Sequence, residues 1–310
     1  MQQFFCAMHR GGNQGKSEMR LNPFDTDNID VRGGSSRFPG GGAGQLGCGT
    51  IIIAGIVSLL FGTDLGQTIA VFDSVDQATN GGQVARSEGQ VSEEQLCSSS
   101  QYATEACNAL QSLNQTWKPV FAQADVGFEQ PFLYLFSGGV STKGCGSASS
   151  AVGPFYCPAD GGIYLDTSFY DVMQRELGAG GDFARLYVVA HEYGHHIQNL
   201  TGLAAQVRSL QQRTPRDANA LQVRMELQAD CYAGVWAGKN RDRIDPGDFA
   251  EGMEAAAAIG DDAISERMGG RASPESFTHG TSEQRMEALR LGMRSGDDTT
   301  CDRYFAPESF

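Results

Sequence analysis

Hydrophobic and polar residues follow two different periods along this chain of 310 residues. Two short stretches, Phe132–Phe136 and Gly162–Asp166, are dense in aromatic and aliphatic residues and are bounded by glycine or proline, which predicts strands. Apolar residues spaced three or four apart predict helices. Helices are expected at 92–117, 182–200, 218–237, 253–259 and 283–291. The mixture favours an α+β fold that is rich in helix and has a small sheet.

The expected helices carry end signals. Ser92 and Gln95 form a capping box, and Asp182 can cap the helix that continues to Leu200. Gly202 ends that helix, and Gly238 follows the 218–237 helix.

The first 91 residues differ in composition from the rest. The strongest apolar run is Ile51–Phe61, and no charged residue occurs from Phe38 to Thr63. Eleven residues alone would suit a buried helix or a signal peptide, but the charge-free window is long enough for a helix that crosses a bilayer. We therefore divide the chain into a disordered glycine-rich tail (1–45), a transmembrane helix (46–63), a polar linker (64–91) and one domain (92–310).

Basic residues flank the apolar run unequally. Arg32 and Arg37 precede it, and the next basic residue is Arg86. Positive charge is retained on the cytoplasmic side of a membrane. The sequence thus predicts a single-pass membrane protein with its N-terminus in the cytoplasm and its domain outside.

Overall charge and cysteine content narrow the partners and the compartment. Lys and Arg number 23 against 37 Asp and Glu, a net charge of −14, which argues against nucleic acid as a partner. The eight cysteines form no CxxC pair, so they fit either disulfides in an oxidising compartment or isolated buried thiols. Cys145 and Cys157 are the best candidate pair. Cys97 and Cys107 cannot bond within one continuous helix, because ten residues rise about 15 Å.

Candidate chemistry begins with an HExxH motif at 191–195. His191 and His195 lie four residues apart on a predicted helix, so both imidazoles leave one face and can bind one metal ion. Glu192 can reach a water molecule on that metal and act as general base. The pattern predicts a metal-dependent hydrolase.

A zinc site of this type needs a third protein ligand and an open position for water. Residues 198 and 201 are Gln and Thr, which excludes the three-histidine arrangement. Glu226 and Asp230 instead form ExxxD on the next long helix. We expect Glu226 to bind the metal and Asp230 to accept the free ring N–H of a ligand histidine. The predicted cofactor is Zn²⁺.

His279 completes the predicted catalytic set. It lies in a Gly/Ser/Thr-rich loop just before a helix, where it could donate to the oxyanion of a tetrahedral intermediate. An ordinary loop histidine remains an alternative. Tyr187 and Tyr232, on the two metal-bearing helices, are the other candidate donors.

Long stretches of the chain resemble the neutral zinc metallopeptidase family of bacteria, most of whose members are single-pass membrane proteins. The resemblance covers residues 19–304 and is carried by the motifs at 136–160, 181–202, 226–238, 258–264 and 276–285. It implies a zincin-like domain in which His191, His195 and Glu226 bind zinc and Glu192 is catalytic.

Two classes of function remain open. The first is a membrane-anchored zinc endopeptidase that acts on protein or peptide substrates. The second is a binding or scaffold protein with a structural or vestigial zinc site, which would not need Glu192 beside its ligands. If Gly162–Asp166 is an edge strand, it could pair with an extended peptide over the metal.

Overall fold

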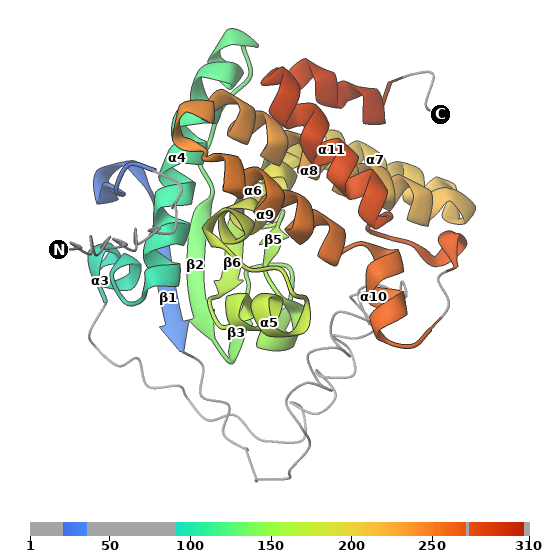
Figure 1. Ribbon diagram of the computed structural model, residues 1–310. Helices are drawn as coiled ribbons and strands as arrows, with labels where there is room; N and C mark the ends of the chain where they lie inside the picture. Colours follow the sequence, from blue (N-terminus) through green and yellow to red (C-terminus); the bar gives the residue numbers. More distant parts are fainter. Residues whose placement is uncertain (1–20, 36–90, 271–272, 307–310) are drawn as a thin grey trace, which may run out of the picture.

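The computed structural model of the chain describes residues 21–35, 91–270 and 273–306 (Figure 1). Four strands form the main sheet in the order β1-β2-β6-β5. They are β1 (Val31–Ser35), β2 (Phe132–Ser137), β5 (Phe155–Cys157) and β6 (Gly162–Asp166), and a separate hairpin joins β3 (Gly139–Ser141) to β4 (Ser147–Ser149).

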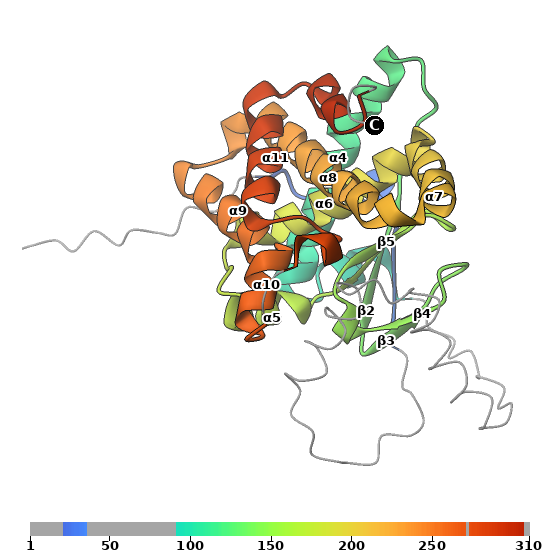
Figure 2. The ribbon, with the colours of Figure 1, turned by 90° about the vertical axis from the view of Figure 1, so that its right-hand side faces the viewer.

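The α-helices stack beside this sheet, as the two views show (Figures 1 and 2). They are α3 (Glu93–Cys97), α4 (Gln101–Gln123), α5 (Phe169–Glu176), α6 (Asp182–Leu200), α7 (Leu203–Arg213), α8 (Ala218–Lys239), α9 (Pro246–Ala258), α10 (Asp261–Arg267) and α11 (Ser282–Ser295). Helix α6 is central, since it packs against α4, α8, α9 and the β5–β6 pair. The predicted mixture of many helices and a small sheet is confirmed.

The two strands predicted from the sequence are present as β2 and β6. They are parallel neighbours, with Leu133 opposite Ile163 and Leu135 opposite Leu165. These four side chains face the helices and belong to the main core. Alternate residues such as Phe132 and Tyr164 pack into a smaller cluster on the opposite face, as the two-residue period of a strand requires.

The expectation that Gly162–Asp166 forms an edge strand is wrong. All five residues of β6 are buried, because β2 pairs with one side of the strand and β5 with the other. In the described part of the chain, the strand beyond β6 is the short antiparallel β5. An extended ligand would therefore have to pair with β5.

The helix predicted from Ser92 to Trp117 is two helices. The capping box is confirmed, because Ser92 and Gln95 exchange their hydrogen bonds at the start of α3. Helix α3 ends at Cys97, and the Ser100 side chain caps the next helix, α4, by accepting from the Ala103 N–H. The break brings Cys97 and Cys107 together in a disulfide with a Cα–Cα distance of 5.9 Å. The exclusion of this pair was wrong because its premise, a continuous helix, fails.

The other described cysteines are also paired. The predicted Cys145–Cys157 disulfide is confirmed, and Cys231 of α8 is bonded to Cys301 near the end of the described chain. The latter joins residues 70 positions apart and fixes the C-terminal segment to the helix that carries Glu226. Six cysteines therefore form three disulfides, as an oxidising compartment allows.

The expected division of the N-terminal region needs correction. Residues 21–35 were assigned to a disordered tail, but they are ordered, and β1 pairs with β2. The predicted transmembrane helix (46–63) lies entirely outside the described residues, and so does the predicted linker (64–91) except for Val91. Within the described ranges, no helix combines the length and the apolar character needed to cross a membrane.

Candidate zinc site

Helices α6 and α8 meet closely at the HExxH motif. Gly194 lies against α8, where a Cβ atom would be 2.8 Å from the Ala229 Cα and 2.9 Å from its carbonyl oxygen. Any larger residue would push the helices apart. The glycine inside the motif therefore lets the two predicted metal-binding segments face each other at short range.

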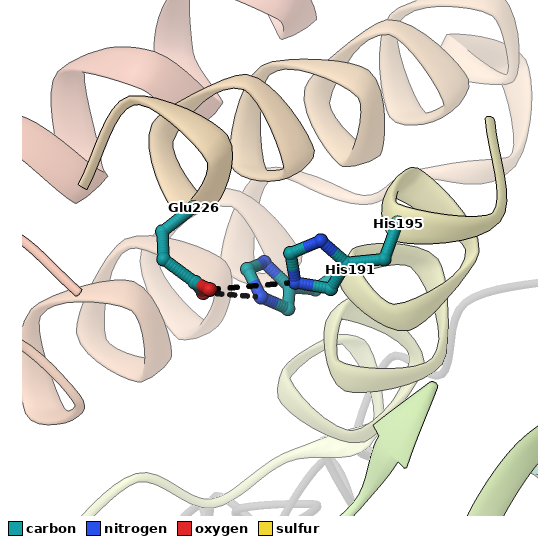
Figure 3. A group of neighbouring side chains, drawn as sticks. All are labelled: His191, His195 and Glu226. Atoms are coloured by element: carbon teal, nitrogen blue, oxygen red, sulfur yellow. Dashed lines mark hydrogen bonds and ion pairs between the residues drawn. The ribbon is translucent and has the colours of Figure 1, made fainter. Parts of the chain in front are cut away.

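The three predicted ligands converge between these helices (Figure 3). The Nε2 atoms of His191 and His195 lie 3.1 and 3.6 Å from the two carboxylate oxygens of Glu226. One donor atom from each residue fits within 4.8 Å of the others. His191 and Glu226 are buried, and His195 is partly exposed, so the group opens toward solvent on the His195 side.

His191 is held from behind by a buried charged network. Its Nδ1 atom lies 2.8 Å from Asp230 Oδ1, which also accepts from the Tyr187 hydroxyl at 2.5 Å. Arg285 of α11 donates to both Asp230 oxygens at 2.9 Å. Asp230 is fully buried and Arg285 is 1% exposed, so each neutralises a charge that would otherwise be costly in the interior.

The same network shifts the ionisation of its members. Burial would raise the pKa of Asp230, but Arg285 and His191 lower it below its usual value, so the carboxylate stays charged. Burial would lower the pKa of His191, but Asp230 and the hydrogen bond to Glu226 raise it to about 10. Without a metal, His191 thus holds a proton between two carboxylates.

His195 is held by neutral groups. Its Nδ1 atom lies 2.9 Å from the side-chain amide oxygen Oε1 of Gln198, one turn along α6. The Gln198 amide group donates to the Met225 carbonyl oxygen at 2.8 Å and to Gln228 at 3.0 Å. Gln198 is fully buried. This side chain therefore fixes the imidazole ring and also ties α6 to α8.

Glu192 lies beside the ligand group without belonging to it. Glu192 is 8% exposed, and burial raises the pKa of its carboxyl group above the usual value. Burial would also raise the pKa of Glu226, but His195 and His191 lower it well below its usual range. The two glutamates at the site therefore differ: the carboxyl pKa is lowered at Glu226, a candidate ligand, and raised at Glu192.

His279 lies on a loop that is built around Asp261. The buried Asp261 Oδ2 atom accepts from three consecutive backbone N–H groups, those of residues 278, 279 and 280, at 2.7 to 3.0 Å. Its Oδ1 atom lies 3.2 Å from His279 Nδ1. Gly280 rests on α8 against Val223 and Leu227, on either side of Glu226 in sequence. His279 contributes to lowering the pKa of Glu226, which agrees with this placement.

Neither tyrosine proposed as an alternative donor is available. The Tyr187 hydroxyl is fully buried and is engaged by Asp230 and Arg285. Tyr232 packs edge-on against Trp117, with ring centroids 5.4 Å apart. Of the three candidates, His279 alone combines partial exposure with a position near Glu226.

The histidine that follows the motif has a structural role. His196 is 2% exposed, and burial lowers its pKa to about 4, so it is neutral. Its Nε2 atom donates to the Glu129 carbonyl oxygen at 2.7 Å, which leaves Nδ1 to accept from the Tyr156 hydroxyl at 3.0 Å. Asn199 of α6 donates to the same hydroxyl at 2.9 Å. These bonds fix β5 to the helix that carries the ligands.

A second group of carboxylates lies at the start of α6. Asp182, Asp248 and Glu251 also offer oxygens within 4.8 Å of one another. Glu251 accepts from the Phe183 N–H at 3.2 Å, and Asp248 accepts from the Asp245 N–H at 2.9 Å. Both bonds satisfy N–H groups at helix starts, so this group stabilises the ends of α6 and α9.

Comparison with known proteins identifies the family. Residues 19–304 match the family model described as "Putative neutral zinc metallopeptidase". The chain belongs to the neutral zinc metallopeptidase family. It is 48% identical over 198 residues to "Uncharacterized protein YpfJ" of Escherichia coli (strain K12), an alignment that covers 63% of this chain and 69% of that protein. No solved structure is significantly similar to it.

A mycobacterial relative shows a similar match. "Uncharacterized protein Rv2575" of Mycobacterium tuberculosis (strain ATCC 25618 / H37Rv) is 43% identical over 210 residues, which cover 64% of this chain and 69% of that protein.

The residues fit the cofactor that the family implies, which is Zn²⁺. Two imidazole nitrogens and one carboxylate oxygen are donors that zinc accepts, and three protein donors leave a fourth position open. The raised pKa of His191 reflects the two carboxylates that a cation would otherwise balance. His191, His195 and Glu226 would hold the ion, with Asp230 and Gln198 orienting the two imidazoles.

Proposed function

We propose that this protein is a zinc-dependent endopeptidase that hydrolyses peptide bonds with Glu192 as general base. The observation that carries the proposal is a buried carboxylate outside the ligand set but adjacent to it. A structural zinc site has four protein ligands and no use for such a group. Here three donors converge, and Glu192 lies one residue beyond the first of them.

The roles of the chain's own residues follow from this arrangement. When bound, zinc polarises the scissile carbonyl group and lowers the pKa of a water molecule. Glu192 removes a proton from the attacking water and passes it to the leaving amine, and the rise of its pKa above the usual carboxyl value makes it a stronger base for this role. Asp230 and Gln198 hold His191 and His195 in fixed orientations.

Strand β5 is the proposed site where a peptide substrate aligns. It is the outer strand on its side of the described sheet, and Tyr156 bonds it to His196 and Asn199 of α6. An extended peptide can add to such an edge through backbone hydrogen bonds. The bonds from Tyr156 would keep that peptide at a constant distance from the HExxH residues.

His279 is the proposed donor to the oxyanion. Its Nδ1 atom faces Asp261, which leaves Nε2 as the group that can reach a substrate. Asp261 fixes both the imidazole ring and the loop backbone, so it acts as a positioning residue for His279. A donor that is fixed in advance stabilises developing charge without the cost of reorganising.

The decisive experiment compares the full chain with Glu192→Gln. Both proteins are loaded with zinc, and metal content and hydrolysis of casein are measured. We expect about one zinc per chain in both, because the substitution removes no ligand, and no hydrolysis in Glu192→Gln. Zinc binding by both with hydrolysis by neither would favour a scaffold function. Full activity of Glu192→Gln would contradict the mechanism.

A second experiment tests His279. His279→Ala should lower kcat by about 10²–10³, the usual cost of removing one oxyanion donor, and leave KM and zinc content nearly unchanged. Asp261→Asn should change kcat in the same direction, because Asn cannot accept all the bonds that Asp261 accepts. His9→Ala serves as a control that loses a histidine outside the ligand group and outside the described residues. Loss of zinc from His279→Ala would instead make His279 a ligand.

A further inference from the structure

The N-terminal segment is an integral part of the catalytic domain. Strand β1 pairs in parallel with β2 over five residues, from Val31 opposite Leu133 to Ser35 opposite Ser137 (Figure 1). Ile29 and Val31 are 5% and 3% exposed and belong to the main hydrophobic core. The domain is therefore incomplete without residues that precede the apolar run of the sequence.

Polar groups of α4 also depend on this segment. Gln111 is 4% exposed, accepts from the Asp25 N–H at 2.5 Å and donates to the Pro23 carbonyl oxygen at 2.9 Å. Asn114 is 6% exposed and donates to the Asn28 carbonyl oxygen at 3.2 Å. Without the segment, these buried amides would lose partners, at a cost of about 1–3 kcal/mol for each unsatisfied group.

The residues on either side of 36–90 contact each other directly. The Val31 N–H donates to Glu93 Oε1 at 3.3 Å. Gly33 lies under the Leu96 side chain, where a Cβ atom would be only 2.5 Å from Leu96 Cδ2. Strand β1 ends just before this stretch of sequence, and α3 begins just after it. The end of β1 and the start of α3 thus lie at neighbouring points of the domain.

We infer that residues 21–35 and the rest of the described chain lie on the same side of any membrane. A bilayer core separates its two faces by about 30 Å, whereas paired strands lie about 4.8 Å apart. Strand β1 therefore cannot face one side of a bilayer while β2 faces the other.

The charge argument for the single-pass arrangement has a different explanation in the fold. Arg32 is a residue of β1, where it pairs with Asp30 at 2.6 Å and lies 3.8 Å from the centre of the Phe132 ring. The Arg32 charge therefore interacts with groups of the domain itself. The three disulfides favour an oxidising compartment, and the pairing of β1 with β2 places residues 21–35 in the same compartment.

Thiol labelling of the full chain in intact bacterial spheroplasts tests the inference. Two single-cysteine additions, Arg32→Cys and Met268→Cys, are made at exposed positions in a chain that also carries Cys6→Ser and Cys48→Ser. Both should react with a membrane-impermeant maleimide before lysis. Reaction of Met268→Cys alone, with Arg32→Cys reacting only after lysis, would overturn the inference. Protection of both until lysis would support a shared side and contradict the oxidising compartment.

Two further measurements test the inference without relying on the labelling of Arg32→Cys alone. The pair Arg32→Cys with Tyr134→Cys occupies directly opposite positions of β1 and β2, so it should form a disulfide in the full chain. The control pair Arg32→Cys with Met268→Cys, on well-separated elements (Figure 1), should not. If these variants fail to fold, an epitope tag before Met1 leaves every described residue unchanged. Antibody binding to the tag on intact spheroplasts supports the inference, and binding only after lysis overturns it.

Discussion

The two histidines of the HExxH motif are one turn apart on the same helix, yet they are supported in different ways. His191 faces a buried network made by the charged Asp230 and Arg285 side chains and the neutral Tyr187 hydroxyl. His195 faces the neutral amide of Gln198. One ligand is therefore held by ionic groups from two other helices, and the other by a residue of its own helix.

This difference predicts that the two ligands contribute differently to zinc binding. A carboxylate behind an imidazole raises its basicity and strengthens it as a ligand, but it also makes the proton a stronger competitor for the metal. A neutral amide orients the ring without that competition. The strength and the pH dependence of metal binding should therefore arise mainly from the His191 side, with Gln198 contributing mostly orientation.

The largest expected effect comes from Arg285→Leu. The substitution leaves the Asp230 charge buried without its partner, which should lower the free energy of unfolding by about 3–5 kcal/mol. Arg290→Leu, on the same helix and paired with Glu287 at the surface, is the matched control and should change it by less than about 1 kcal/mol. Chemical denaturation at pH 7 measures both.

The double variant Arg285→Leu/Asp230→Asn sharpens this test. Asn removes the unpaired charge and should restore part of the lost stability, while zinc binding stays weak because His191 lacks its carboxylate. If Arg285→Leu alone is as stable as the unchanged protein, Asp230 is not held as a buried anion, and the contrast between the two histidines fails.

A second prediction concerns Asp230→Asn and the pH dependence of zinc affinity. Since the pKa of His191 is about 10 in the metal-free protein, zinc must displace a proton below that pH. The Kd should therefore fall about tenfold per pH unit between pH 7 and 9. Asp230→Asn removes the main partner that raises this pKa, so its Kd should change less with pH. Its affinity deficit, about 10–100-fold, should grow as the pH rises.

Chelator competition at pH 7, 8 and 9 measures these dissociation constants. An equal slope for Asp230→Asn and the unchanged protein would place the competing proton elsewhere in the site.

The smallest effect is expected from Gln198→Met. It removes one neutral hydrogen bond to His195, worth about 1 kcal/mol, so zinc affinity should weaken about fivefold with an unchanged pH slope. Asn240→Leu, at the C-terminal end of α8, also loses an amide bond to a backbone carbonyl, that of Trp236, and should leave zinc affinity unchanged. A loss from Gln198→Met as large as that from Asp230→Asn would remove the distinction between the two sides.

The ligand group could be predicted because its information is local. The spacing of His191 and His195 fixes their common helix face, and the same rule places Glu226 and Asp230 together on the next long helix. The two strands and the Cys145–Cys157 disulfide likewise depend on short stretches of sequence.

The supporting residues could not be predicted because their partners are distant in the chain. Arg285 is 55 residues from Asp230, and Asp261 is 18 residues from His279. Nothing in a single sequence distinguishes these side chains from surface charges. The Ser-rich break after Cys97 carried a signal, since Ser100 can cap a helix, but the helical pattern on both sides masked it. Strand β1 contains two glycines and was therefore assigned to a tail.

The central claim is that His191, His195 and Glu226 bind zinc between α6 and α8. Diffraction from crystals of the zinc-loaded full chain, recorded on both sides of the zinc absorption edge, tests it most directly. We expect one anomalous peak per chain, about 2.0–2.2 Å from the two Nε2 atoms and a Glu226 oxygen, with Glu192 close by but not bound to the metal. A peak among Asp182, Asp248 and Glu251, or none at the HExxH motif, would contradict the claim.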